Sequence, residues 1–328
     1  MNRKTVPLTI ALAAIAASTA LPVAAAAPTV RAAVLSDGTL RVSGSPFGDT
    51  IVLRVSATDR TQLQVDVGGD GTADDTFDIG TVRAIDVEAG NGDDTVRIDQ
   101  ANGVFTTTIA TRIDGGNGDD TLIGGSGNEI FDGGRGNDVV DGNGGADTAF
   151  LGNGDDTFVW DPGDGSDVVE GGRGSDTLVF NGSGGNEIMA ATAIFGRVAF
   201  TRNLGNIVMD LDGIEAIDVN ALGGTDAVTV NNLSGTDVTR VDVDLAPKLG
   251  SSDPDGQADT VTVAGTKGDD SIAVDANGAA VDVRGLAAVV RITHADPTKD
   301  ALVIDPVTGT DEVTIDPAVN ALIRASVL

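Results

Sequence analysis

Short runs in which every second residue is apolar recur along most of the chain. Examples are 50–55, 259–263 and 312–315, which lie close to Gly, Asp or Asn residues. Alternation with a period of two over four to six residues predicts short strands with one buried face. No convincing amphipathic helix follows the N-terminal region, and 186–193 is the best candidate for one. The pattern therefore predicts an all-β protein.

The middle of the chain adds a second period, of nine residues. Seven units occupy 115–159 and 162–179, each with a Gly-rich half, an acidic residue at position 6 and an apolar residue at position 8. One turn and one strand per unit mean that two units close a coil, so units of the same parity stack on the same edge. We expect Trp160 and Asp161, which interrupt the period, to bulge outward. The position-8 side chains, expected to point inward, are Leu122, Phe131, Val140, Ala149, Phe158, Val169 and Leu178.

Weaker copies of the unit flank this region. We divide the chain after a leader into an N-terminal flank (27–111), a nonapeptide region (112–182) and a C-terminal flank (183–328). No Pro/Ser-rich linker separates them, which favours one continuous parallel β-solenoid, stabilised by contacts between neighbouring coils, over independent domains. The degenerate copies centre on Asp94, Asp226, Asp270 and Asp311. Because none of these four has a partner unit nine or eighteen residues away, we favour a plain turn role for them.

The N-terminus resembles a secretory signal peptide over residues 1–26. A basic start at Arg3 and Lys4 precedes an apolar stretch (6–20) and an Ala-x-Ala cleavage site at 24–26. The alternative is an uncleaved membrane anchor. No later segment approaches the ~20 apolar residues needed to span a bilayer. These features predict a secreted or cell-surface protein without stable membrane insertion after cleavage.

Composition narrows the chemistry. The chain has a formal net charge of −30, 45 glycines, no tyrosine and no cysteine. Without cysteine there are no disulfides and no thiolate metal sites. Nucleic acid and anionic membranes need basic patches, so neither is an expected partner. The charge instead favours metal cations.

Position 6 places carboxylates in two ladders, one on each edge. The first edge carries Asp120, Asp138, Asp156 and Asp176, and the second carries Glu129, Asp147 and Asp167. Neighbouring strands lie ~4.8 Å apart, and like charges at about that distance repel by roughly 1 kcal/mol even in water. Between residues 114 and 178 there are 15 acidic and only 2 basic residues. The chain's own charges therefore cannot neutralise the ladders.

Calcium fits this chemistry best. It prefers six to eight oxygen ligands, whereas magnesium demands a tighter octahedron and zinc favours His or Cys. Gly-rich turns also expose backbone carbonyls that can complete a calcium shell. The alternative is that the position-6 residues are solvated turn formers.

These units resemble the repeats-in-toxin (RTX), or haemolysin-type calcium-binding, family. The resemblance implies a right-handed parallel β-roll with calcium between successive turns, and we expect about three to five Ca²⁺ ions. The implied side-chain ligands are Asp120, Asp138, Asp147, Asp156, Asp167 and Asp176, with Glu129 and the outlying Asp94 as less regular candidates.

The leading functional hypothesis is a non-enzymatic protein that calcium folds outside the cell, with a structural, surface, matrix or adhesion role. A cell-surface or matrix polymer is a possible partner, and the sequence does not indicate an oligomeric state. The alternative is a calcium-dependent extracellular enzyme that acts on acidic polysaccharide. We find no G-x-S-x-G or H-E-x-x-H motif. A cytolytic toxin lacks support because no hydrophobic pore-forming region precedes the repeats.

Overall fold

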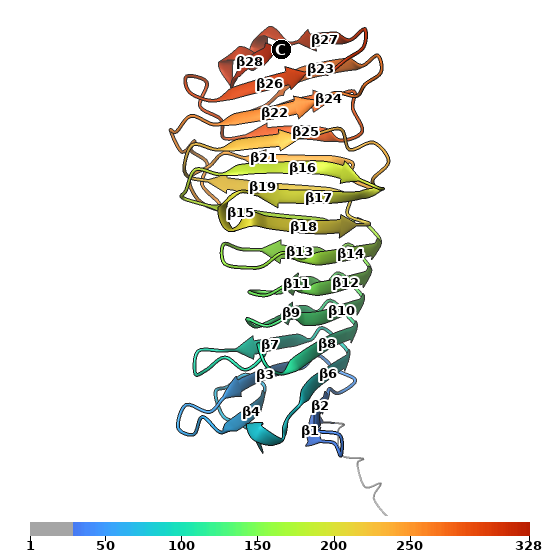
Figure 1. Cartoon of the computed structure of the whole chain (residues 1–328), viewed down its shortest axis with the longest axis vertical. Helices are drawn as coiled ribbons and strands as arrows, with labels where there is room; N and C mark the ends of the chain where they lie inside the picture. The colour runs from blue at the N-terminus through green and yellow to red at the C-terminus, as the bar shows by residue number, and fades with distance from the viewer. Residues whose placement is uncertain (1–28) are drawn as a thin grey trace, which may run out of the picture.

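The computed structural model describes residues 29–328, so the predicted signal peptide lies outside the described residues. Coils of strand and turn stack along one long axis from the N-terminal to the C-terminal end (Figure 1). The strands form two fourteen-stranded sheets, and both sheets run through the flanks and the nonapeptide region. The chain is a parallel β-roll continued at both ends as a β-solenoid, which confirms the predicted all-β fold class.

In spatial order, the first sheet contains β1 (Arg31–Val34), β2 (Thr39–Ser43), β6 (Ala84–Asn91), β8 (Ala110–Asn117), β10 (Glu129–Arg135), β12 (Thr148–Asn153), β14 (Val168–Arg173), β18 (Ile207–Asp212), β17 (Arg197–Arg202), β16 (Ile188–Ile194), β20 (Ala227–Val230), β22 (Thr260–Ala264), β26 (Ala301–Asp305) and β28 (Arg324–Val327). The second contains β27 (Glu312–Ile315), β23 (Ser271–Asn277), β24 (Ala280–Arg284), β25 (Val289–Thr293), β21 (Arg240–Asp244), β19 (Ala216–Leu222), β15 (Thr177–Ser183), β13 (Thr157–Trp160), β11 (Val139–Asp141), β9 (Thr121–Ile123), β7 (Thr95–Asp99), β3 (Thr50–Val55), β4 (Gln62–Val67) and β5 (Asp75–Asp78). Three short 3₁₀ turns, η1 (Ile79–Thr81), η2 (Leu204–Asn206) and η3 (Pro317–Ala321), are the helical segments of the described chain.

The register in the nonapeptide region follows the sequence period. In β11, Val140 pairs in parallel with Leu122 of β9 and Phe158 of β13, so position 8 faces position 8 one coil away. All seven position-8 side chains are buried, as predicted. They form one continuous apolar core with the flanks, and this core is enclosed between the two sheets.

Antiparallel excursions interrupt the parallel stacking outside the repeats. Strands β3, β4 and β5 fold back on one another near the N-terminus, as do β16, β17 and β18, and later β23, β24 and β25. Each excursion lengthens a coil but returns the chain to the stack. The best candidate for a helix, 186–193, is mostly strand β16, which pairs with β17, in agreement with the predicted lack of amphipathic helices.

The expected outward bulge of Trp160 and Asp161 is wrong for Trp160, whereas Asp161 is exposed directly after the strand. Trp160 ends strand β13 with its side chain fully buried, stacked on Phe180 with a ring-centroid distance of 4.1 Å. Its indole N–H donates to the carbonyl of Gly165 (2.8 Å). Burying a large aromatic surface is favourable once the N–H has a partner, so only the following turn absorbs the extra residues.

No helix in residues 29–328 is long and apolar enough to cross a membrane.

Candidate calcium-binding site

The position-6 carboxylates form hydrogen-bonded ladders. On the first edge, the backbone N–H of Asp120 donates to Asp138 Oδ1 (2.8 Å), and that of Asp138 donates to Asp156 Oδ1 (2.7 Å). Asp156 in turn donates to Asp176 Oδ1 (2.9 Å). One oxygen of each carboxylate is thus held by the backbone of the preceding coil, so the coil spacing fixes the spacing of the carboxylates.

The second edge is built in the same way. The N–H of Glu129 donates to Asp147 Oδ1 (2.7 Å), and the N–H of Asp147 donates to Asp167 Oδ1 (2.9 Å). The two predicted edges are therefore present with the predicted membership. The sequence did not predict the hydrogen bonds from backbone N–H groups that connect successive carboxylates of each ladder.

The second oxygen of these carboxylates has no partner. The position-6 residues of the repeats are at most 1% exposed. Their other side-chain oxygen is fully buried without a hydrogen bond in Asp94, Asp120, Glu129, Asp138, Asp147, Asp156, Asp167 and Asp176. A buried acceptor without a partner is costly, and an ionised one more so. A row of such oxygens is the arrangement expected of ligands for a cation.

Backbone conformation determines which oxygens stay unpaired. In the unit of Asp120, the residue four positions earlier is Gly116, which has a φ of +104°. In the unit of Glu129 the equivalent Gly125 does not have a positive φ, and its N–H donates to Oε2 (2.8 Å). Every aspartate named above with an unpaired oxygen follows a left-handed residue at this place: Gly90, Gly116, Gly134, Asn143, Gly152, Gly163 and Gly172. We call each acidic residue of a ladder a rung. A rung is open when the residue four positions earlier is left-handed, and closed when the backbone N–H of that residue donates a hydrogen bond to the carboxylate.

Glycine at position 1 completes a cradle beside each of several open rungs. A Cβ added to Gly115 would lie 2.4 Å from Asp120 Oδ2 and 2.8 Å from the carbonyl oxygen of Gly133. A Cβ on Gly133 would meet Asp138 Oδ2 at 2.6 Å and the Leu151 carbonyl at 2.4 Å. The unpaired carboxylate oxygen and a carbonyl of the next coil therefore converge on a space that only glycine leaves free.

Burial perturbs the acidity of the rungs. It is the main cause that raises the pKa of Asp120, Asp138 and Asp156 from 3.8 to about 6, and neighbouring carboxylates add to the effect. Asp147 has its pKa raised to about 9 by burial, and the charges of Glu129 and Asp167 contribute. The backbone hydrogen bonds oppose these shifts without cancelling them. The ladders thus favour either protons or another cation.

The donor set fits calcium. Within residues 29–328, no cluster of three or more His, Cys, Asp or Glu side chains could hold a metal alone. A metal at the rungs would therefore need oxygen ligands besides the carboxylates, and calcium accepts backbone carbonyls in that role. Unpaired carboxylate oxygens beside turn carbonyls provide that mixture. Glu129 fits less well, because one of its oxygens is already bound by Gly125.

The ladders continue into both flanks, although the flanking acids have no partner unit nine or eighteen residues away. On the first edge, Asp49 donates its N–H to Asp94, and Asp94 donates to Asp120 (2.6 and 2.8 Å). On the second edge, Glu187 donates to Asp226 and Asp226 to Asp259 (both 2.8 Å). The partner is 26 to 45 residues away instead of 18, because inserted strands and loops lengthen the coils. A short repeat spacing could not detect it.

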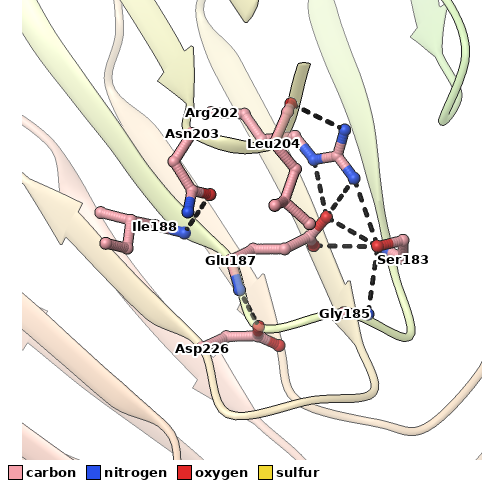
Figure 2. A network of polar contacts seen from close by, with 8 residues as sticks. All are labelled: Ser183, Gly185, Glu187, Ile188, Arg202, Asn203, Leu204 and Asp226. Atoms are coloured by element: carbon pink, nitrogen blue, oxygen red, sulfur yellow. Dashed lines mark hydrogen bonds and ion pairs between the residues drawn. The ribbon is translucent and has the colours of Figure 1, made fainter. Parts of the chain in front are cut away.

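One rung carries its own cation. Arg202 of β17 binds Glu187 Oε1 through both Nε (2.6 Å) and Nη2, and both side chains are buried (Figure 2). The other oxygen, Oε2, accepts the N–H of Ser183 (3.0 Å). The guanidinium also lies 5.3 Å from the ring centre of Trp160. The Glu187 rung is therefore closed and neutralised without a metal.

The fold and these rungs define a parallel β-roll with acidic ladders. The model of the RTX calcium-binding nonapeptide repeat, four copies, matches residues 110–140, 123–158 and 162–193. A comparison with curated proteins found no match. The middle of this chain therefore carries RTX-type calcium-binding repeats, as the resemblance predicted, and calcium is their cation.

Proposed function

We propose that the protein is a secreted or cell-surface calcium-binding β-roll whose stability outside the cell depends on about three to five bound Ca²⁺ ions. The observation that carries this proposal is the row of buried carboxylate oxygens without hydrogen-bond partners in the repeats. The proposed side-chain ligands are the aspartates of the open rungs, with Asp94 as the first and Asp176 as the last. Glu129 is the weakest candidate of the predicted set.

Calcium acts in this proposal as a folding cofactor. Without it, the open rungs hold buried, mutually repelling charges, and the repeats are destabilised. When calcium binds, its binding free energy becomes folding free energy. Extracellular calcium modules commonly have dissociation constants of ~10⁻⁴ to 10⁻³ M, so a chain of this kind folds fully only after export. The biological role is structural, as a component of a surface or matrix.

The test is a calcium titration of the whole protein, followed by far-UV circular dichroism and Trp160 fluorescence. Trp160 is the sole tryptophan and there is no tyrosine, so its signal is free of interference. We expect both signals to change together at sub-millimolar to millimolar calcium, and magnesium to be far less effective. A chain that is fully folded in chelator and indifferent to calcium would contradict the proposal.

The alternative of an enzyme for acidic polysaccharide has a concave surface to consider. An open groove of about 610 Å³ lies beside the repeats, and its charged lining consists of Arg97, Asp99, Asp141 and Asp164. A polyanion needs a basic cleft, whereas this groove carries three carboxylates to one guanidinium. The groove therefore favours the non-enzymatic proposal. Release of unsaturated sugars from an acidic polysaccharide would reverse that preference.

A further inference from the structure

One rung of the C-terminal flank has the geometry of the repeats but lies outside the matched residues. Asp226 is 2% exposed. Its Oδ1 accepts the N–H of Glu187 (Figure 2). Its Oδ2 is buried without a hydrogen bond. The family match ends at residue 193, and Asp226 belongs to a degenerate copy of the unit for which the sequence favoured a plain turn role.

The backbone before Asp226 reproduces the two left-handed positions of an open rung. Gly224 has a φ of +130°, as Gly118 has +129° before Asp120. Gly224 also lies against the carbonyl of Gly185 in the preceding coil, in the way that Gly118 lies against Gly92. The neighbouring Thr225 donates its N–H to Asn186 Oδ1 one coil back, as Asp119 in the repeats donates its N–H to Asp93 Oδ1.

The other left-handed position is occupied by Leu222, which has a φ of +67°. Leucine rarely adopts this conformation, because its Cβ approaches the carbonyl. Strain of this kind persists where the surroundings enforce it, and it points to a functional constraint. Here it has a direct consequence. In the rung of Glu187 the residue four positions earlier, Ser183, donates its N–H to the carboxylate. The left-handed Leu222 makes no such bond, so Asp226 Oδ2 stays unpaired.

The next coil brings further carboxylates to this rung. Asp259 receives the N–H of Asp226 on Oδ1 and is itself 2% exposed. Asp255, four residues before Asp259, has a second buried carboxylate oxygen without a partner. Burial is the main cause that raises the pKa of Asp226 to about 7, and the charges of Asp259, Glu187 and Asp255 add to it. Of these acids, only Glu187 has an arginine bound to it.

We propose that the C-terminal flank binds one calcium ion at the unpaired oxygen of Asp226, with turn carbonyls completing the shell and the nearby Asp255 and Asp259 adding negative charge that favours a cation. The inference rests on the proposed calcium chemistry of the repeats but uses none of their residues. It makes the adjoining rungs a pair: Glu187 is neutralised by the built-in cation Arg202, and Asp226 by calcium.

Calcium stoichiometry of the whole protein tests this site. Equilibrium dialysis with ⁴⁵Ca²⁺ at saturation should show one ion fewer in Asp226→Asn than in the wild type. Asparagine keeps an oxygen that can accept the N–H of Glu187, so the rung survives the change. The matched control is Asp253→Asn, an exposed acid of the same flank with the same charge change. The control should bind the wild-type number of ions.

A second measurement guards against misfolding of the variant. In hydrogen–deuterium exchange of the wild type, calcium should protect 221–230, and Leu222→Gly should retain both the protection and the ion count because glycine tolerates this φ. If the wild type binds calcium but 221–230 gains no protection, or Asp226→Asn loses no ion, this site is overturned while the repeats stand. If the wild type binds no calcium at all, the proposed function fails as well.

Discussion

Without calcium, the stability of the folded protein should fall as the pH rises from about 5 to 7.5. In the folded chain, the pKa values of Asp120, Asp138 and Asp156 lie near 6 instead of 3.8, chiefly because the side chains are buried. A raised acid pKa means that the folded state binds more protons than the unfolded state. The stability that this contributes is complete below about pH 4 and is lost as the pH rises through about 6.

The magnitude follows from the shift. One pKa unit corresponds to ~1.4 kcal/mol, so a rise of two units costs at most about 3 kcal/mol per carboxylate at neutral pH. The pKa of about 6 already includes the opposing backbone hydrogen bonds, and the rungs interact with one another, so the three costs do not simply add. Even a few kcal/mol in total is a large share of the ~5–15 kcal/mol that stabilises a typical domain.

The assay is urea unfolding of the calcium-stripped protein at pH 5.0 and pH 7.5, followed by Trp160 fluorescence. We expect the stripped protein to be more stable at pH 5.0 by a few kcal/mol. With saturating calcium the difference should vanish or change sign, because calcium replaces the protons and binds less well where they compete. Equal stability of the stripped protein at both pH values would refute the reasoning. So would the same decline in the presence of calcium.

Three further predictions test single parts of the site. Asp138→Asn should weaken calcium binding at least about tenfold, or ~1.4 kcal/mol, in calorimetric titration. The control Asp119→Asn, which removes an exposed carboxylate of the same region, should have little effect. Equal losses in the two variants would mean that the overall negative charge, and not ligation by Asp138, determines the affinity. Gly133→Ala should destabilise the calcium-bound protein by ~1–3 kcal/mol in thermal unfolding, because the new Cβ would lie 2.4 Å from a carbonyl oxygen. Gly144→Ala is the control and should be nearly neutral, because the nearest atom to its new Cβ is 3.5 Å away. Because Asp147 has its pKa raised to about 9, calcium binding at pH 7.5 should release a proton, measured as a dependence of the binding heat on the ionisation enthalpy of the buffer. Asp147→Asn should remove most of that dependence, and an undiminished dependence would exclude Asp147 as the main source.

The sequence was sufficient to predict the fold where the coil length is constant. In the nonapeptide region, position 6 and position 8 recur every nine residues, so the period alone places Asp138 on the first edge and Val140 in the core. The flanks obey the same rule, but excursions such as β17 and β18 lengthen one coil to 39 residues between Glu187 and Asp226. Pairing across such a distance is decided by the tertiary stack, which no local period reveals.

Whether a rung is open or closed could not be predicted from the sequence either. Glycine at positions 2 and 4 indicates left-handed turns, but Leu222 adopts the same conformation although leucine disfavours it. In the other direction, Gly125 occupies a glycine position and leaves the rung of Glu129 closed. Arg202 is far from Glu187 in sequence, and only the return of β17 along β16 brings them together.

The distribution of closed rungs explains how one solenoid can be partly dependent on calcium. Beyond Glu129 and Glu187, the flanking Asp49, Asp270 and Asp300 each accept the backbone N–H four residues earlier, so their carboxylates need no metal. The open rungs are concentrated between Asp94 and Asp176. In a stacked solenoid the stability of each coil depends mainly on its neighbours. Metal-independent rungs at both ends can therefore hold the ends of the stack in register, and calcium completes the acidic middle between them.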